Sequence, residues 1–256
     1  MSVELSYQQD IAVLTLNRPE ALNALNASMI AQIDEFLDEV SLSDARALVV
    51  VGAGGKAFCA GADVKELLDK DYSQQHLTSR RGQTAFAKLD DLSIPSVAVI
   101  TGVAFGGGLE LAMACTFRIA TGTSRFALPE IKLGLIPGFG GTQRLPRLVG
   151  TSRALELIAS GRVVDAEEAE RTGLVNRIVS ATDPVAAGRE YLSEFGERFP
   201  AAMRQAIAAT FSAFDQEISE GLIREADLFA AATQTEDAAE GVRAFLEKRK
   251  ANFVGR

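Results

Sequence analysis

The chain has 256 residues, of which 47% are hydrophobic and 23% charged, and its net charge is −8 at pH 7. The length fits one large domain or a domain with a smaller appendage, and the composition is that of a soluble globular protein. The acidic balance argues against general affinity for nucleic acid or anionic membranes. Two cysteines, Cys59 and Cys115, are too few for a disulfide framework. Because residues 1–6 show no secretory signal and no apolar run reaches membrane-spanning length, a cytoplasmic location is expected.

Strand-like and helix-like patterns alternate in the first part of the chain. Residues 3–7 and 11–16 read as the two strands of a hairpin. Asn26 is a candidate N-cap for a helix. The apolar residues on one face of that helix are Met29, Ile33, Phe36, Leu37 and Val40. Continuous apolar runs at 47–51 and 97–101 are typical of buried strands. This alternation predicts a layered α/β core.

The later part of the chain is mostly helical in pattern. The predicted elements are a short strand at Ile178 and helices at 151–160, 165–172, 184–198, 200–214, 219–231 and 236–250. A soft boundary falls near Val185, which divides the chain into a core of residues 1–184 and a helical region of residues 185–256. The polar segment 69–81 favours a solvated helix or loop over a mobile cover above a site.

Residues 57–67 form the first of two glycine-bearing segments that lead from a predicted strand into a helix. Gly61 suits a tight turn, and Asp63 suits a helix N-cap. Taken alone, the segment favours this structural role. A functional interpretation adds that the Ala62 N–H group, at the helix entrance, faces a bound oxygen anion.

Gly106, Gly107 and Gly108 repeat the arrangement ahead of a second helix. Their structural role is to let that helix pack closely on the sheet. Two such entrances in one chain could aim two N–H donors at the same oxygen, which is what an oxyanion hole requires. Neither these glycines nor residues 52–57 have the spacing of a nucleotide-binding fingerprint.

Glu110 and Glu130 are the candidate acid–base pair. Most glutamates lie on the surface, but Glu110 stands among the apolar residues Leu109 and 111–114, where a carboxylate must be paired or functional. A desolvated carboxyl near a second one has a raised pKa, which suits a proton donor near neutral pH. Together with the two glycine segments, the pair indicates proton chemistry on an activated carbonyl compound.

The sequence offers few other candidate catalytic residues. Cys59 reads as a small buried residue and not as a nucleophile, because the only histidine, His76, lies in the polar segment. A single histidine also argues against Ser–His hydrolysis and histidine-rich zinc sites. Phe245 and the cations at 248–250 suit a helix C-terminus, with a phosphate contact as the alternative.

Six segments, in this order, resemble the enoyl-CoA hydratase/isomerase (crotonase) family over essentially the whole chain. They are residues 16–25, 58–63, 106–110, 129–130, 136–145 and 245–250. The resemblance implies a crotonase-like α/β spiral of repeated ββα turns over residues 1–184. It also implies that the helical region 185–256 serves trimerisation, as a homotrimer or a dimer of trimers.

The family similarity also implies roles for site residues. A thioester carbonyl oxygen is expected between the N–H groups of Ala62 and Gly107. Glu130 matches the carboxylate usually assigned proton transfer at the α-carbon, Glu110 matches the one that activates water, and Gly138 matches a backbone position that helps hold the site. The implied contacts to coenzyme A are Ala60, Asp63, Phe245 and Lys248.

The implied activity is that of an enoyl-CoA hydratase, which adds water reversibly and in syn fashion to a 2-trans-enoyl-CoA thioester to give a 3-hydroxyacyl-CoA. Coenzyme A is then part of the substrate, and no separate cofactor or metal is expected. The alternatives are an enoyl-CoA isomerase or another acyl-CoA lyase of the family and, more distantly, a non-catalytic acyl-CoA-binding or RNA-binding relative. Isomerase members generally work with one carboxylate, so the presence of both Glu110 and Glu130 favours the hydratase, with a dual hydratase and isomerase activity as a further alternative.

Overall fold

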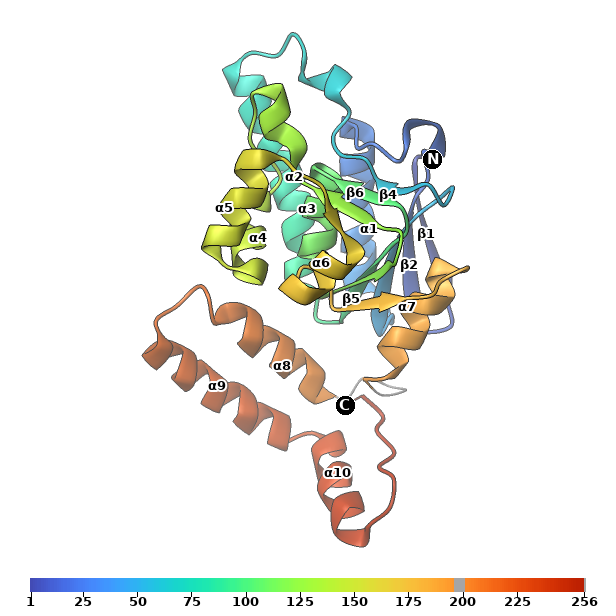
Figure 1. Cartoon of the computed structure of the whole chain (residues 1–256). Helices are drawn as coiled ribbons and strands as arrows, with labels where there is room; N and C mark the ends of the chain where they lie inside the picture. The colour runs from blue at the N-terminus through green and yellow to red at the C-terminus, as the bar shows by residue number, and fades with distance from the viewer. Residues whose placement is uncertain (196–200, 256) are drawn as a thin grey trace. The chain divides into compact units, whose positions relative to one another are not determined.

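The computed structural model describes residues 1–195 and 201–255. They fall into two compact units; apart from a short segment near residue 94, the second unit is coloured from orange to red in Figure 1. Unit 1 comprises Met1–Leu92 and Ser96–Glu190, and unit 2 comprises Ser93–Pro95 and the residues from Tyr191 onward. The division after residue 184 and the trimerisation role of the helical region stay predictions.

Unit 1 holds all the strands of the described chain. They are β1 (Val3–Gln8), β2 (Ile11–Leu16), β3 (Ala47–Gly52), β4 (Ala57–Cys59), β5 (Ser96–Ile100), β6 (Val103–Phe105), β7 (Phe117–Thr121), β8 (Arg125–Ala127), β9 (Val164–Asp165) and β10 (Arg177–Val179). Its α-helices are α1 (Ala27–Leu42), α2 (Tyr72–Asp90), α3 (Gly107–Ala114), α4 (Gly141–Val149), α5 (Thr151–Ser160) and α6 (Ala166–Thr172). Three short 3-10 helices are η1 (Pro19–Ala21), η2 (Val64–Leu67) and η3 (Pro129–Leu133).

The middle of unit 1 repeats a strand–strand–helix pattern. The turns β3–β4–α2, β5–β6–α3 and β7–β8–α4 each place their first strand in one sheet and their second in another. The first sheet has the order β1-β2-β3-β5-β7-β10 and the second the order β4-β6-β8-β9. Every residue of β3 and β5 is buried, as expected for parallel strands covered on both faces. The predicted ββα spiral is confirmed.

The structure confirms the predicted hairpin and the predicted cap of the first helix. The predicted hairpin is β1 paired antiparallel with β2. The Asn26 side chain caps α1 by accepting a hydrogen bond of 2.8 Å from the Met29 N–H group. Of the predicted apolar face of this helix, Phe36 alone is only half-buried.

Two of the later predictions need correction, and one helix was not predicted. The predicted helix at 184–198 is α7 (Pro184–Ser193), and residue 198 lies outside the described residues. The helix predicted to reach residue 250 is α10 (Glu236–Glu247), which ends where Lys248 adopts a left-handed φ of 56°. Helix α4 was not predicted, because Pro146 in its interior argues against a helix.

Unit 2 is helical. Besides α10 it contains α8 (Ala201–Ser212) and α9 (Ile218–Thr233), close to the ranges predicted from the sequence. The predicted start of the first at residue 200 lies outside the described residues. None of the helices formed by residues 1–195 and 201–255 has the length and hydropathy needed to cross a membrane.

A substitution at Gly108 tests how closely α3 packs on β4. A Cβ at this position would lie 2.4 Å from the Cys59 carbonyl oxygen, so Gly108→Ala forces the helix away from the strand. We expect a loss of about 1–3 kcal/mol in the free energy of unfolding, although alanine is the better helix former. Urea denaturation measures it. Gly122→Ala is the control, because a Cβ there meets nothing within 4 Å. Equal stability of the two variants would contradict the packing argument.

Candidate active site

The candidate site lies at one edge of the second sheet. Strands β4, β6 and β8 are parallel neighbours, so their carboxyl ends lie at the same edge. The segments that follow them are 60–63, 106–110 and 128–130, which carry the predicted site residues. The first two segments touch, because a Cβ on Gly106 would lie 3.7 Å from the Gly61 Cα atom. The fold therefore brings together glycine segments that are more than forty residues apart in sequence.

Glu110 is buried, with 1% of its surface exposed. Its Oε1 atom accepts hydrogen bonds from the N–H groups of Phe139 at 2.8 Å and Gly141 at 2.7 Å. Burial raises the pKa of the Glu110 carboxyl to about 7, and the nearby charge of Glu130 raises it as well, against the lowering effect of the Gly141 N–H group. A carboxyl with this pKa can hold or release a proton near neutral pH.

Glu130 faces the point where the glycine segments meet. A Cβ on Gly106 would lie only 2.7 Å from its Oε1 atom, and Gly106 has a φ of 47°, a backbone conformation that favours glycine. Burial also raises the pKa of the Glu130 carboxyl. Its Oε2 atom is buried, and no hydrogen-bond partner for it occurs among residues 1–195 and 201–255. A buried oxygen without a partner is costly to fold, so it is a candidate contact for a ligand or water.

Helix α2 holds the loop that supplies the Glu110 donors. The Gly138 carbonyl oxygen accepts hydrogen bonds from Ser79 Oγ at 2.6 Å and Gln83 Nε2 at 3.0 Å. The Phe139 ring packs beside Gly82, where a Cβ would lie 2.4 Å from the ring. The polar segment 69–81 thus comprises the residues that link η2 to α2 and the first half of α2. Through Ser79, one face of this helix holds the Glu110-binding loop in place.

The other end of the loop is fixed by a left-handed residue and an ion pair. Gly140 has a φ of 113° and stands at the N-cap of α4. Within α4, Arg144 donates a hydrogen bond of 3.3 Å to the Phe139 carbonyl oxygen and forms an ion pair with Asp90 at the end of α2. Both ends of the Glu110-binding loop are therefore tied to helices.

Ala62 and Gly107 are placed as candidate donors. Gly107 is the first residue of α3, so its N–H group has no partner within the helix. Among the hydrogen bonds of the described residues, neither N–H group donates to a protein acceptor. The predicted N-cap at Asp63 is confirmed, through a 3.2 Å bond from the Lys65 N–H group, but the helix that it caps is the short 3-10 helix η2 and not an α-helix.

The segment 18–25 positions the Ala62 loop, a role that the sequence did not reveal. The buried Asn23 side chain donates to the carbonyl oxygens of Ala53 at 3.0 Å and Ala57 at 2.9 Å. Arg18 donates to Asp63 at 2.9 Å. Asn23 adopts a left-handed φ of 58°, which is uncommon outside glycine and costs energy that the surrounding bonds must offset. The asparagine between the apolar residues of this segment is the sequence feature that could have indicated a structural role for Asn23.

The predicted coenzyme A contacts lie in both units. Ala60 and Asp63 stand beside Ala62, and the Ala60 N–H group donates to the Leu22 carbonyl oxygen at 3.0 Å. Phe245, 82% exposed, and Lys248 lie at the end of α10 in unit 2. A contact between these two residues and the site in unit 1 stays a prediction.

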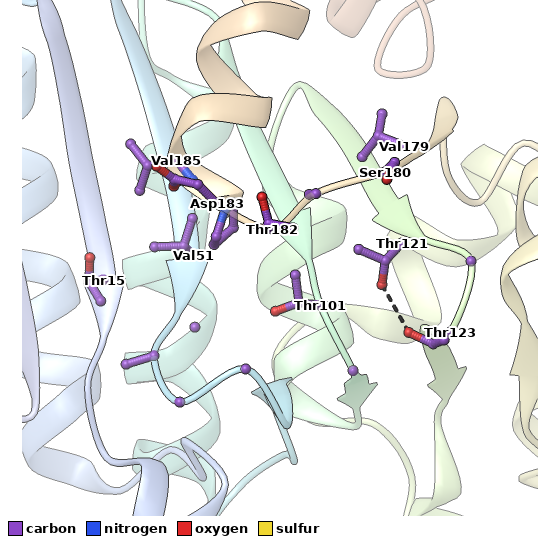
Figure 2. Close-up of a pocket in the computed structure, with 18 of the residues that line it drawn as sticks. Thr15, Val51, Thr101, Thr121, Thr123, Val179, Ser180, Thr182, Asp183 and Val185 are labelled. Atoms are coloured by element: carbon purple, nitrogen blue, oxygen red, sulfur yellow. Dashed lines mark hydrogen bonds between the residues drawn. The ribbon is translucent and has the colours of Figure 1, made fainter.

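A separate groove of about 870 Å³ lies at the carboxyl end of the first sheet. Figure 2 shows threonines from several strands around it, among them Thr15, Thr101 and Thr121. Its one ionisable lining residue is Asp183, whose carboxylate accepts from the Val185 N–H group at 2.9 Å and caps α7. Because the groove contains no acid–base pair, the glutamate site is the better candidate for proton chemistry.

The raised pKa of Glu110 makes stability depend on pH. The ordinary pKa is 4.5, and the folded protein holds the proton up to about pH 7, so ionisation disfavours folding. The stabilising effect is fully present below about pH 4.5 and is lost as pH rises through 7. We expect the free energy of unfolding to fall by up to about 3 kcal/mol over this range and Glu110→Gln to reduce the fall. Denaturant titrations at several pH values measure it. Glu167→Gln, at an exposed carboxyl of α6, is the control, and identical pH profiles for the two variants would contradict the expectation.

Comparisons with known proteins agree with this geometry. A sequence model described as enoyl-CoA hydratase/isomerase matches residues 6–256. The chain is 41% identical over 248 residues to a probable enoyl-CoA hydratase of Mycobacterium bovis, which covers 97% of the chain and 96% of that protein. It is 38% identical over 256 residues to a crotonyl-CoA hydratase of Syntrophomonas wolfei, covering 100% of the chain and 98% of that protein. The crystal structure of an enoyl-CoA hydratase from Bacillus anthracis matches with a TM-score of 0.93 at 34% identity, over the full length of both chains. The chain therefore belongs to the enoyl-CoA hydratase/isomerase family.

Proposed function

We propose that the protein is an enoyl-CoA hydratase that adds water reversibly, in syn fashion, to a 2-trans-enoyl-CoA thioester. The observation that carries this proposal is the pair of glutamates with raised pKa values, one of which has a buried oxygen free to meet a ligand. Family membership and the hydratase names of similar proteins support it. Two carboxyls at one sheet edge also supply the two proton-transfer groups that hydration needs.

The two carboxyls divide the reaction between them. Glu110 accepts a proton from the water, whose oxygen forms a bond to the β-carbon while the π electrons of the carbon–carbon double bond move toward the α-carbon and the thioester oxygen. Protonated Glu130 then delivers its proton to the α-carbon on the same face, and proton exchange with solvent returns both carboxyls to their starting states. The Phe139 and Gly141 N–H groups, which bind Glu110 Oε1, keep that carboxyl oriented throughout.

The thioester carbonyl oxygen binds between the N–H groups of Ala62 and Gly107. Charge grows on this oxygen during hydration, and each donor of an oxyanion hole is typically worth about 2.7–4 kcal/mol. The free N–H groups and the close approach of Gly61 to Gly106 support this assignment. Gly138 contributes through its backbone, because its carbonyl oxygen anchors the Glu110-binding loop to α2.

We further propose that coenzyme A enters as part of the substrate and that no separate cofactor is used. Its contacts are Ala60, Asp63, Phe245 and Lys248. The protein is proposed to work in the cytoplasm as a homotrimer or a dimer of trimers. Large exposed apolar side chains in unit 2, such as Phe229 at 70% and Phe245 at 82% exposure, support assembly through this unit.

Replacing either glutamate by glutamine tests the division of labour. Glu110→Gln and Glu130→Gln each remove one proton-transfer group and keep its shape. We expect turnover of crotonyl-CoA to fall about 10²–10⁴-fold while acyl-CoA binding is retained. Absorbance of the enoyl thioester follows turnover, and calorimetry follows binding. Near-normal turnover in one variant, matching that of the control Glu167→Gln, would sink the role given to that residue.

Product analysis tests hydratase against isomerase. The wild-type protein is incubated separately with a 2-enoyl-CoA and a 3-enoyl-CoA, and products are identified by mass spectrometry after chromatographic separation. We expect a 3-hydroxyacyl-CoA from the first and no conversion of the second, because Glu110 is assigned to the water and only Glu130 to proton transfer at the α-carbon. Efficient conversion of the 3-enoyl-CoA to its 2-enoyl isomer would show that isomerase chemistry is the better description.

A further inference from the structure

A cavity of about 410 Å³ in unit 1 shares walls with the candidate active site. Its lining includes Ala62, the proposed donor to the thioester oxygen, and Phe139, whose N–H group binds Glu110. A chain that starts at the thioester therefore has this cavity directly beside it. The volume falls in the range of small-molecule sites.

Two helices form most of the cavity wall. Helix α1 contributes residues at the spacing i, i+3, i+4 and i+7, which lie on one helix face: Ala27, Ile30, Ala31 and Asp34. Helix α2 contributes Leu77, Arg81 and Thr84 at the spacing i, i+4 and i+7, with Arg80 next to them. The opposite face of α2 carries Ser79, which holds Gly138. One helix thus supports the Glu110-binding loop on one face and borders the cavity on the other.

The carboxylates of the cavity lining are already engaged. Lys88 Nζ lies 2.8 Å from Asp34, and Arg18 lies 2.9 Å from Asp63. Glu66 accepts a hydrogen bond of 2.9 Å from the Ala27 N–H group at the start of α1, where a negative charge is favourable.

The arginines of the lining, in contrast, lack acidic partners. Arg80 donates to the neutral Gln83 side chain at 2.8 Å. Within the described part of the chain, the Arg81 guanidinium has no hydrogen-bond or ion-pair partner. Both side chains are exposed and border the cavity. The same cavity has apolar lining residues, among them Leu25, Ile30 and Leu77. A guanidinium group binds carboxylates in a planar, two-bonded geometry.

Resting on the proposed function, we propose that Arg80 and Arg81 select short enoyl-CoA substrates whose acyl chain ends in a carboxylate. The apolar walls accommodate the methylene groups, and the guanidinium groups at the rim bind the terminal charge. Phe139, whose N–H group binds Glu110, favours the acyl end as the part of the substrate that enters, whereas Asp63 in the same lining is a proposed contact of the coenzyme. The phosphates of coenzyme A are the other anions of the substrate, and the experiment separates the two.

Binding of saturated acyl-CoA analogues tests the proposal without relying on turnover. Glutaryl-CoA carries the terminal carboxylate, glutaryl-CoA methyl ester is its neutral match, and butyryl-CoA is the short apolar reference. Isothermal titration calorimetry gives the three dissociation constants. We expect the wild type to bind glutaryl-CoA at least about 10-fold more tightly than the ester, and Arg81→Gln to lose about 10- to 100-fold on glutaryl-CoA alone.

Three further variants keep the result interpretable. Arg80→Gln is expected to weaken glutaryl-CoA binding in the same selective way, and Arg81→Lys is expected to retain part of the preference, because the charge remains. Arg189→Gln, at a guanidinium that donates to Gln8 and Gln9 on the β1–β2 hairpin, is the matched control and should change nothing.

Equal wild-type affinity for glutaryl-CoA and its ester would overturn the proposal. An equal loss on all three ligands in Arg81→Gln would also overturn it, since that result would place the guanidinium on the coenzyme. Crotonyl-CoA hydration, measured in parallel, reports on the proposed function alone. A carboxylate preference without hydration would sink the hydratase assignment and leave the anion site standing. Hydration of crotonyl-CoA without a preference for the terminal carboxylate would support the hydratase assignment and overturn the anion site.

Discussion

The burial of one carboxyl group governs the architecture of the site. Glu110 is 1% exposed and stays there because the N–H groups of Phe139 and Gly141 bind the same oxygen. A buried carboxyl without such donors would cost several kcal/mol. The two donors require the loop 137–141 to hold one shape, and α2 and α4 are tied to that loop from either side. One pair of hydrogen bonds therefore links the buried carboxyl to a loop that is itself held by two helices.

The parallel strands of the second sheet supply the rest of the geometry. Because β4, β6 and β8 end at one edge, the turns that follow them meet without any long loop. Glycine is favoured where the turns touch, because Gly106 has a φ of 47° and a Cβ there would lie 2.7 Å from Glu130 Oε1. The result is a site that brings N–H groups without a protein acceptor and two carboxyls to the same sheet edge. Burial raises the pKa of both carboxyls, so the fold that assembles the pair also tunes it.

Much of this could be predicted from local sequence signals. The Asn26 cap, the apolar runs of β3 and β5 and the glycine turns are each encoded within a few residues. What could not be predicted depends on long-range contacts. The donors of Glu110 lie 29 and 31 residues away, and β4, β6 and β8 are three-residue strands too short to show a pattern. Helix α4 forms despite Pro146 because its ends are fixed by the loop and by neighbouring contacts, which a local pattern does not report.

The central claim is that burial and the neighbouring carboxyl raise the pKa of Glu110 into the neutral range. The most direct measurement is a carbon-13 NMR titration of the Glu110 side-chain carboxyl, assigned by its loss in Glu110→Gln. We predict a midpoint near pH 7, as the pKa of about 7 requires, and a lower midpoint in Glu130→Gln, where the second charge is gone. A midpoint near the ordinary value of 4.5, unchanged by removing Glu130, would contradict the account.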